Sequence, residues 1–292
     1  MNTPALPHLT HARAPLTEEV MAVDETGQAR RVSIPAERAL TLYVDKREVV
    51  TLMTLGAHPE WLVLGYLCNQ RLIAGAQDVH SITVDWDVGA AAVRTRAGIA
   101  DLAARTARRV VTSGCGQGSV FGDWLADIER LRLGDARLTQ AGLYAVLAAI
   151  RAQESTYKSA GSVHGCALFD GAGDREGEGD GQAVRMRLFV EDVGRHNAID
   201  TIAGWMALQD AATRRGGDKL FYTTGRLTSE MVLKAAQMGV PIVVSRSGIT
   251  QMGLALARQL GLCAVGRAVN RHFICYSAPE RLVWQPEGGP EG

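Results

Sequence analysis

The 292-residue chain has no net charge and no long apolar run, and each absence excludes a class of protein. Lysine and arginine together number 31, as do aspartate and glutamate, so the surface as a whole attracts neither nucleic acid nor an anionic membrane. No window approaches the ~18 consecutive apolar residues of a membrane span, and residues 1–17 contain no apolar signal core. We therefore expect a cytoplasmic protein with no membrane and no nucleic acid among its partners.

Cysteine is also scarce, and its spacing excludes two structural uses. The five cysteines are odd in number, and they lie too far apart for a disulfide framework or a four-ligand zinc motif. We expect most of them to be buried apolar residues, and we treat Cys115 separately below. They are Cys68, Cys115, Cys166, Cys263 and Cys275.

The composition that remains is that of an ordinary folded protein, with 47% hydrophobic and 21% charged residues. At roughly 100–200 residues per domain, the length predicts one large domain or two modest ones. We predict an α/β protein with four parts: a loosely ordered arm over 1–35 with a short strand near 31–34, a small α+β domain over 36–135, an α/β domain over 136–285, and a flexible tail over 286–292.

The first half of the chain alternates between strand and helix patterns. Residues 41–53 read as two strands joined by a turn at Asp45 and Lys46, and a helix follows His58 and Pro59. Two further strands are predicted at 80–85 and 91–95. Spaced apolar residues predict an amphipathic helix over 138–153, with Thr139 as its cap, and the glycine-rich, charged stretch 170–183 is predicted to be a solvated loop.

The last third carries two consecutive βα units that nearly repeat each other. In each, a strand ends in a turn with an arginine, a threonine starts a helix, and a glycine ends it. The two sets are Arg226, Thr228 and Gly239, then Arg246, Thr250 and Gly261. The alternation predicts a mostly parallel sheet with strands at 186–190, 219–223, 242–245 and 263–266.

The two arginine turns are candidate phosphate sites. Helix N-termini present unpaired N–H groups, and arginine or hydroxyl side chains add donors, so Arg226, Ser229, Arg246 and Ser247 suit a diphosphate. Ligands of open α/β sheets bind outside the carboxyl ends of the strands, where both turns fall. The alternative is that the threonines simply cap their helices while the arginines lie in solvent.

The segment 191–197 (EDVGRHN) also lies between a predicted strand and a predicted helix over 198–208. Three interpretations stay open: Asn197 caps the helix, one or more of Arg195, His196 and Asn197 contact a ligand, or Glu191, Asp192 and His196 bind a metal. The metal interpretation is weak, because hard carboxylates with a single histidine do not form a typical ligand set.

Cys115 lies in a glycine-rich loop, between Gly114 and Gly116. Such a loop buries a thiol poorly, so an incidental surface cysteine and a reactive nucleophile are the two alternatives, and the exposed loop favours the nucleophile. A redox dithiol is not expected, because the position three residues on is Gly118. A zinc deaminase is not expected, because Cys166, two positions after His164, stands where that chemistry needs glutamate, and no Pro-Cys-x-x-Cys motif follows.

Taken together, these stretches resemble the FdhD family, the formate dehydrogenase accessory sulfurtransferases, from about residue 40 to 283. The resemblance depends on the motifs TSGCG at 112–116, GSVHGCALFD at 161–170, EDVGRHNAID at 191–200, the βα repeats at 223–268 and RHFICYS at 271–277.

The resemblance implies a sulfur carrier. A cysteine desulfurase would load Cys115 as a persulfide, and the sulfur would pass to molybdenum or tungsten bis(molybdopterin guanine dinucleotide) before that cofactor enters formate dehydrogenase. It also implies a homodimer, a cytidine-deaminase-like α/β domain without zinc, and GDP as a mimic of the bound cofactor. The cofactor-binding segment corresponds to Phe273, Ile274, Cys275, Tyr276, Ser277 and Ala278.

One position departs from the family pattern. The family loop commonly reads Cys-Gly-x-Cys-Gly, whereas Gly118 stands here in place of the second cysteine. A persulfide needs one acceptor thiol, so a carrier with Cys115 alone is chemically sufficient. The alternative is a non-catalytic chaperone that binds and delivers the cofactor without transferring sulfur.

Overall fold

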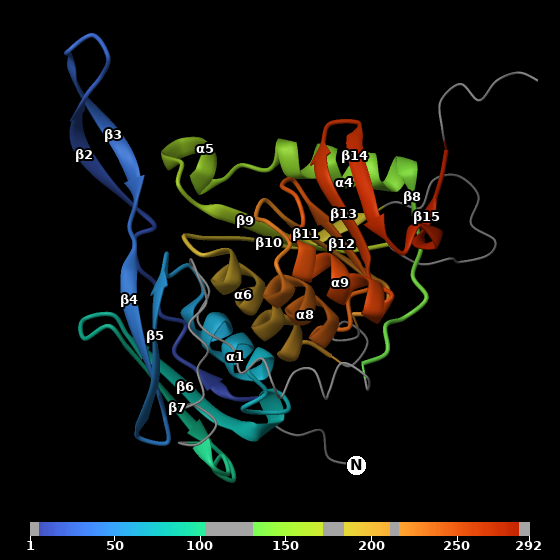
Figure 1. Cartoon of the computed structure of the whole chain (residues 1–292). Helices are drawn as coiled ribbons and strands as arrows, with labels where there is room; N and C mark the ends of the chain where they lie inside the picture. The colour runs from blue at the N-terminus through green and yellow to red at the C-terminus, as the bar shows by residue number, and fades with distance from the viewer. Residues whose placement is uncertain (1–5, 103–130, 172–183, 211–215, 286–292) are drawn as a thin grey trace, which may run out of the picture. The chain divides into compact units, whose positions relative to one another are not determined.

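The computed structural model describes residues 6–102, 131–171, 184–210 and 216–285 (Figure 1). Cys115 and most of the glycine-rich stretch 170–183 lie outside the described residues. The chain is a mixed α/β protein. No helix among the described residues is long and apolar enough to cross a membrane.

The chain divides into two compact units that interleave along the sequence. The first unit contains residues 1–125, 154–166 and 190–214, and the second contains 126–153, 167–189 and 215–292. The predicted division near residue 135 assigned all of 136–285 to one domain, whereas 154–166 and 190–214 pack with the first unit. The chain therefore crosses between the units along strands β9 (His164–Asp170) and β10 (Arg185–Asp192).

A five-stranded sheet organises the first unit. Its order is β1-β6-β7-β4-β5, and β4 and β5 form the predicted hairpin, in which Asp45 and Lys46 adopt positive φ angles of 47° and 71°. The predicted strands near 80–85 and 91–95 are confirmed as β6 and β7. The bounds are β1 His8–Leu9, β4 Arg38–Val44, β5 Arg47–Thr54, β6 Val79–Asp85 and β7 Ala90–Thr95, with a 3-10 turn η1 at Ala76–Asp78.

The predicted loose arm at the N-terminus is wrong for most of its length. Strands β2 (Thr17–Val23) and β3 (Ala29–Pro35) form a separate antiparallel hairpin, with Val20 opposite Val32 (Figure 1). The Asp24 side chain closes the turn by accepting hydrogen bonds from the backbone N–H groups of Thr26 and Gln28. The prolines that suggested a loose arm do not interrupt either strand, because Pro15 precedes β2 and Pro35 ends β3.

Two helices of the first unit cross in direct backbone contact. Helix α1 (Pro59–Asn69) starts at the predicted His58-Pro59 position, and α6 (Arg195–Ala207) packs against it. At the crossing, a Cβ atom on Gly65 would lie 2.6 Å from the Gly204 nitrogen, and one on Gly204 would lie 2.8 Å from the Gly65 nitrogen. Only glycine permits this approach. The short helix α5 (Thr156–Ala160) completes the unit.

A six-stranded sheet runs through the second unit in the order β10-β9-β11-β12-β13-β14. Strands β11, β12 and β13 are parallel, as the repeat predicted, and β14 is an antiparallel edge strand. The core contains β-branched, leucine and aromatic side chains such as Leu220, Tyr222, Val244 and Val265. The bounds are β11 Lys219–Thr223, β12 Ile242–Ser245, β13 Cys263–Val269 and β14 His272–Ser277.

Helices lie on both sides of this sheet (Figure 1). Helix α4 (Gln140–Ala152) covers one side and is capped by Thr139, whose Oγ1 accepts from the Gly142 N–H at 3.0 Å, as predicted. Helices α8 (Ser229–Gln237) and α9 (Gln251–Leu260) lie on the other side. The strands β8 (Leu138–Thr139) and β15 (Leu282–Val283) pair in parallel, after a 3-10 turn η2 at Pro279–Arg281.

Candidate functional site

The two arginine turns lie side by side at the carboxyl ends of β11 and β12. The Leu227 N–H donates to the Gly248 carbonyl at 2.9 Å, and the Thr250 N–H donates to the Leu227 carbonyl at 3.0 Å. These bonds link the turn after β11 to the turn after β12. The structure therefore brings together the two turns that the sequence proposed as one phosphate site.

Ser245 fixes the shape of both turns from inside. Its Oγ donates to the Gly225 carbonyl at 2.7 Å and accepts from the Ser247 N–H at 2.9 Å. The Arg246 N–H donates to the Thr223 carbonyl at 3.0 Å, while the side chains of Arg226 and Arg246 are exposed. The backbone is therefore rigidly bonded, and two cationic side chains extend from it into solvent.

The two helix starts differ in their caps. Thr250 caps α9, because its Oγ1 accepts from the Gly253 N–H at 3.2 Å. Thr228 occupies the same position before α8 but makes no side-chain cap bond, and its buried Oγ1 has no hydrogen-bond partner within the described residues. The capping interpretation is thus confirmed for Thr250 and wrong for Thr228. Ser229 is the half-buried first residue of α8, so its hydroxyl lies at a helix start that no threonine caps.

The edge strand β14 brings one further predicted side chain to these turns. A Cβ atom on Gly266 would lie 2.9 Å from the Tyr276 ring and 3.0 Å from the Ser247 carbonyl oxygen, so Tyr276 and Ser247 both approach this glycine. Larger residues at 266 would separate them. Arg246, Ser247 and Tyr276 therefore belong to one region of the second unit.

The other residues of the predicted segment 273–278 have structural contacts. Ser277 is buried, with its Oγ donating to the Leu262 carbonyl at 2.8 Å and accepting from the Ala264 N–H at 3.2 Å. The Phe273 ring stacks on Trp284 at 5.9 Å and packs against the core. Ile274 is 37% exposed, Ala278 has a positive φ of 47°, and Cys275 contacts Cys263.

The segment 191–197 builds a buried hydrogen-bond network in the first unit. Asp192 Oδ2 accepts from the Thr54 hydroxyl at 2.5 Å and the Leu55 N–H at 3.2 Å, and its Oδ1 accepts from the Gly194 N–H and Asn197 Nδ2. Burial raises the pKa of Asp192, and these four donors partly oppose that rise. The network ties β10 and α6 to β5.

Asn197 is not a helix cap, which corrects one sequence interpretation. Helix α6 begins at Arg195 with Gly194 as its N-cap, so Asn197 lies inside the first turn. Its Nδ2 donates to the Met53 carbonyl at 2.6 Å and to Asp192. His196 and Asn197 are 2% and 3% exposed, and they lie in the first unit, whereas the arginine turns lie in the second. Ligand contact at His196 and Asn197 stays a prediction.

The metal interpretation of this segment gains no support from the described residues. Glu191 holds the start of α5 instead, since its carboxylate accepts from the N–H groups of Thr156 and Tyr157. Among the described residues, no group of three or more histidine, cysteine, aspartate or glutamate side chains has the proximity of a metal site.

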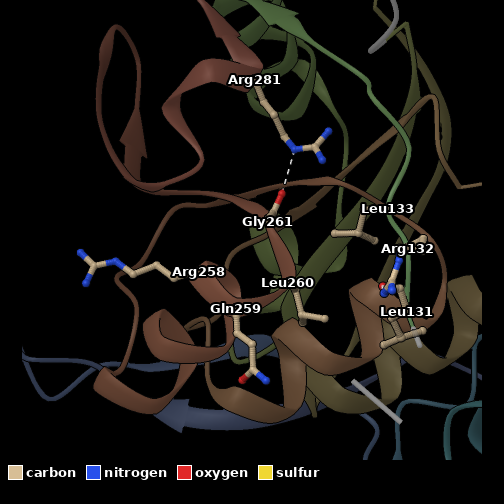
Figure 2. Close-up of a pocket in the computed structure, with 8 residues that line it drawn as sticks. All are labelled: Leu131, Arg132, Leu133, Arg258, Gln259, Leu260, Gly261 and Arg281. Carbon is tan, nitrogen blue, oxygen red and sulfur yellow. Dashed lines mark hydrogen bonds between the residues drawn. The ribbon is translucent and has the colours of Figure 1, made fainter. Parts of the chain in front are cut away.

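A pocket of about 570 Å³ in the second unit, which the sequence did not suggest, lies at the end of α9 (Figure 2). Its lining includes Arg132, Arg258 and Arg281. The Arg281 side chain donates to two backbone carbonyls, from Nε to Gly261 at 2.8 Å and from Nη1 to Gly134 at 2.5 Å. Figure 2 shows the Arg258 side chain extending away from Arg281. We interpret Arg281 as the residue that fixes the carboxyl end of α9.

A second pocket, of about 420 Å³, lies at the start of α1 in the first unit. The His58 ring stacks on Trp61 with 4.2 Å between centroids, and the buried Glu60 carboxylate accepts from the Ala12 N–H at 2.7 Å. Burial lowers the pKa of His58, which favours the neutral form of its ring. These contacts hold the chain near Ala12 against α1.

A protein-family model matches most of the chain and includes these motifs. The model of the FdhD/NarQ family matches residues 35–283, which includes the Cys115 loop, the segment 191–200 and both arginine turns. The chain belongs to the FdhD/NarQ family. The resemblance seen in the sequence motifs is thereby confirmed.

Curated members of the FdhD/NarQ family align over nearly the whole chain. A protein named sulfur carrier protein FdhD from Bacillus subtilis (strain 168) is 30% identical over 263 residues, covering 88% of this chain and 94% of the relative. Its namesake from Staphylococcus aureus (strain MRSA252) is 29% identical over 252 residues, covering 85% and 88%.

A solved structure also matches this FdhD/NarQ chain. The crystal structure of a protein described as a formate dehydrogenase accessory protein, from Desulfotalea psychrophila, superimposes with a TM-score of 0.70 at 26% identity. The match covers 92% of this chain and 100% of that one. The relatives' names thus connect the family to sulfur transfer and to formate dehydrogenase.

Proposed function

We propose that this FdhD/NarQ chain is a sulfur carrier for formate dehydrogenase. A cysteine desulfurase hands sulfur to Cys115 as a persulfide, and the chain passes it to molybdenum or tungsten bis(molybdopterin guanine dinucleotide) before insertion into formate dehydrogenase. The observation that carries the proposal is family membership together with the retained TSGCG motif, in which Cys115 stands between two glycines. The names of the relatives support it.

The bonded turns after β11 and β12 are the proposed site for the guanine dinucleotide phosphates. Arg226 and Arg246 supply charge, and the start of α8 supplies backbone N–H groups that no threonine side chain caps. Tyr276, beside Ser247, supplies an aromatic ring at the same edge of the sheet. Cationic donors, a helix start and a ring suit a nucleoside diphosphate.

The proposal includes several features that the sequence resemblance implied. The chain acts in the cytoplasm as a homodimer, and its second unit has a topology related to cytidine deaminases but uses no zinc. The three parallel strands with flanking helices support that topology. The competing proposal is a non-catalytic chaperone that delivers the same cofactor, which is favoured by the loss of the second loop thiol at Gly118.

The proposal is tested by intact mass spectrometry after incubation with a cysteine desulfurase and cysteine. We expect the wild-type chain to gain one sulfur atom that a reductant removes, because the Cys115 thiolate attacks the outer sulfur of the desulfurase persulfide. The Cys115→Ala variant should show no added sulfur on the peptide that contains residue 115. A wild-type chain that binds GDP yet gains no sulfur would support the chaperone instead.

The phosphate site is tested by GDP binding in a calorimeter. Replacing Arg226 or Arg246 with alanine should weaken the binding free energy of GDP by about 1.5–3 kcal/mol, because each substitution removes a charge-assisted hydrogen bond to phosphate. Arg258→Ala is the matched control, since Arg258 is an exposed arginine near the opposite end of α9. Unchanged affinity in both turn variants would contradict the diphosphate site.

A further inference from the structure

Two cysteines outside the glycine loop face each other across the last two strands of the second unit. The Sγ atoms of Cys263 on β13 and Cys275 on β14 lie 4.0 Å apart. The strand register places Cys275 opposite Val265, so Cys263, two residues earlier on the same face, is its diagonal neighbour. Both thiols are free, and both contact the core of this unit.

The two thiols differ in access. Cys263 is 0% exposed, whereas Cys275 is half-buried on the edge strand. A sulfur donor from solution therefore reaches Cys275 first. Because Cys263 is fully buried, a sulfur atom can reach it only after that atom has been bound at Cys275.

The thiols also differ in acidity. Either sulfur could donate across the 4.0 Å contact, and because the Cys275 S–H already donates to the Ser277 carbonyl, we assign the Cys263 S–H as the donor to the Cys275 sulfur. This bond lowers the pKa of Cys275. The same bond, and then burial, raise the pKa of Cys263, which keeps its proton. The Cys275 sulfur also lies 3.4 Å from the Ser277 carbonyl, which accepts its proton in the thiol form. Cys275 is thus suited to act as a nucleophile, and Cys263 as a proton-bearing partner.

We propose that Cys275 and Cys263 form a second sulfur-handling site, which accepts the outer sulfur of a persulfide at Cys275 and releases it as sulfide through attack by Cys263. The inference rests on the proposed function in one respect, namely that persulfides are the sulfur source the chain meets. The site provides a pair of thiols in a chain whose loop lacks the second cysteine.

The chemistry balances in two steps. First, the Cys275 thiolate attacks the outer sulfur of a donor persulfide, the donor S–S bond breaks, and the donor leaves as a thiolate, so Cys275 becomes a persulfide without net oxidation. Second, the Cys263 thiol attacks the inner sulfur of the Cys275 persulfide, a Cys263–Cys275 S–S bond forms, and the Cys263 proton passes to the departing outer sulfur. The outer sulfur leaves as sulfide, taking two electrons, while the two cysteines are oxidised to a disulfide.

The geometry permits this second step with local motion. A disulfide needs its sulfurs about 2.05 Å apart, so the 4.0 Å separation must close by side-chain rotation and a shift of the edge strand. Strand β14 pairs with β13 on one side and has no other strand beside it within the described sheet, so it has room to move. A low-molecular-weight dithiol then reduces the pair and resets the site.

The test uses the full-length Cys115→Ala chain, fully reduced, with limiting glutathione persulfide in the absence of oxygen. We expect release of sulfide and loss of two hydrogen masses, with the disulfide mapped to the peptides containing Cys263 and Cys275. Adding Cys263→Ala should stop the reaction at a reductant-sensitive gain of one sulfur on Cys275, with sulfide at the protein-free level. Adding Cys275→Ala should abolish both the gain and the release.

The matched control is Cys68→Ala in the same background, which removes a thiol whose pKa burial raises to about 12 and should leave the reaction unchanged. Sulfide release that survives both Cys263→Ala and Cys275→Ala would overturn the proposal, as would a sulfur gain confined to Cys68 or Cys166. Because Cys115 is absent throughout, such a failure leaves the Cys115 persulfide unaffected. Conversely, if the wild-type chain never acquires sulfur at Cys115, sulfide release that depends on Cys263 and Cys275 would still support the second site.

Discussion

Replacing Gly204 with alanine is expected to destabilise the first unit by about 3 kcal/mol or more, the upper part of the range for overpacked cores. The new Cβ atom would collide with the Trp61 carbonyl and lie 2.8 Å from the Gly65 nitrogen. Both are backbone atoms of α1 and cannot rotate away, so α1 and α6 must separate. Alanine's better helix propensity offsets only about 1 kcal/mol of this cost.

Equilibrium unfolding in urea measures the effect. Gly217→Ala is the control, because a Cβ atom there meets its nearest neighbour at 3.6 Å, an ordinary contact, and the backbone φ is not positive. We expect Gly217→Ala to unfold at nearly the wild-type urea concentration and Gly204→Ala at a much lower one. Equal midpoints for the two variants would mean that the helices are not in backbone contact.

The two helices could be predicted from the sequence, but their crossing could not. The patterns predicted both helices, because apolar spacing and the His58-Pro59 start are local signals. That Gly65 and Gly204 meet is a long-range fact, and 139 positions of chain separate them. The interleaving of the two units was missed for the same reason, since the sequence assigned 154–166 and 190–214 to the same domain as the rest of 136–285.

The candidate site likewise has parts that the sequence predicts and parts that it does not. Arg226 and Arg246 could be placed together, because the carboxyl ends of neighbouring parallel strands meet at one edge of the sheet. Asn197 could not be placed correctly, because its local position suited a cap while its amide bonds Met53, which lies 144 residues away. The approach of Cys263 to Cys275 depends on the register between β13 and β14, which the sequence does not display.

Replacing Cys115 with alanine should abolish maturation of formate dehydrogenase while leaving the fold and GDP binding intact. The reason is chemical, since a persulfide carrier needs an acceptor thiol, and alanine removes it without adding bulk or charge. The measurement is formate dehydrogenase activity in cells that lack the native gene and carry the variant. We expect activity at the level of cells with no copy at all.

Three further measurements make this result specific. Soluble Cys115→Ala protein with wild-type GDP affinity would exclude a folding defect. The Cys68→Ala variant, which removes a half-buried thiol elsewhere, should restore activity as the wild type does. The reverse substitution Gly118→Cys restores the common family loop and should leave maturation intact if one thiol suffices. If Cys115→Ala itself supports nearly full activity, sulfur does not pass through Cys115, and the chain functions by binding and delivering the cofactor.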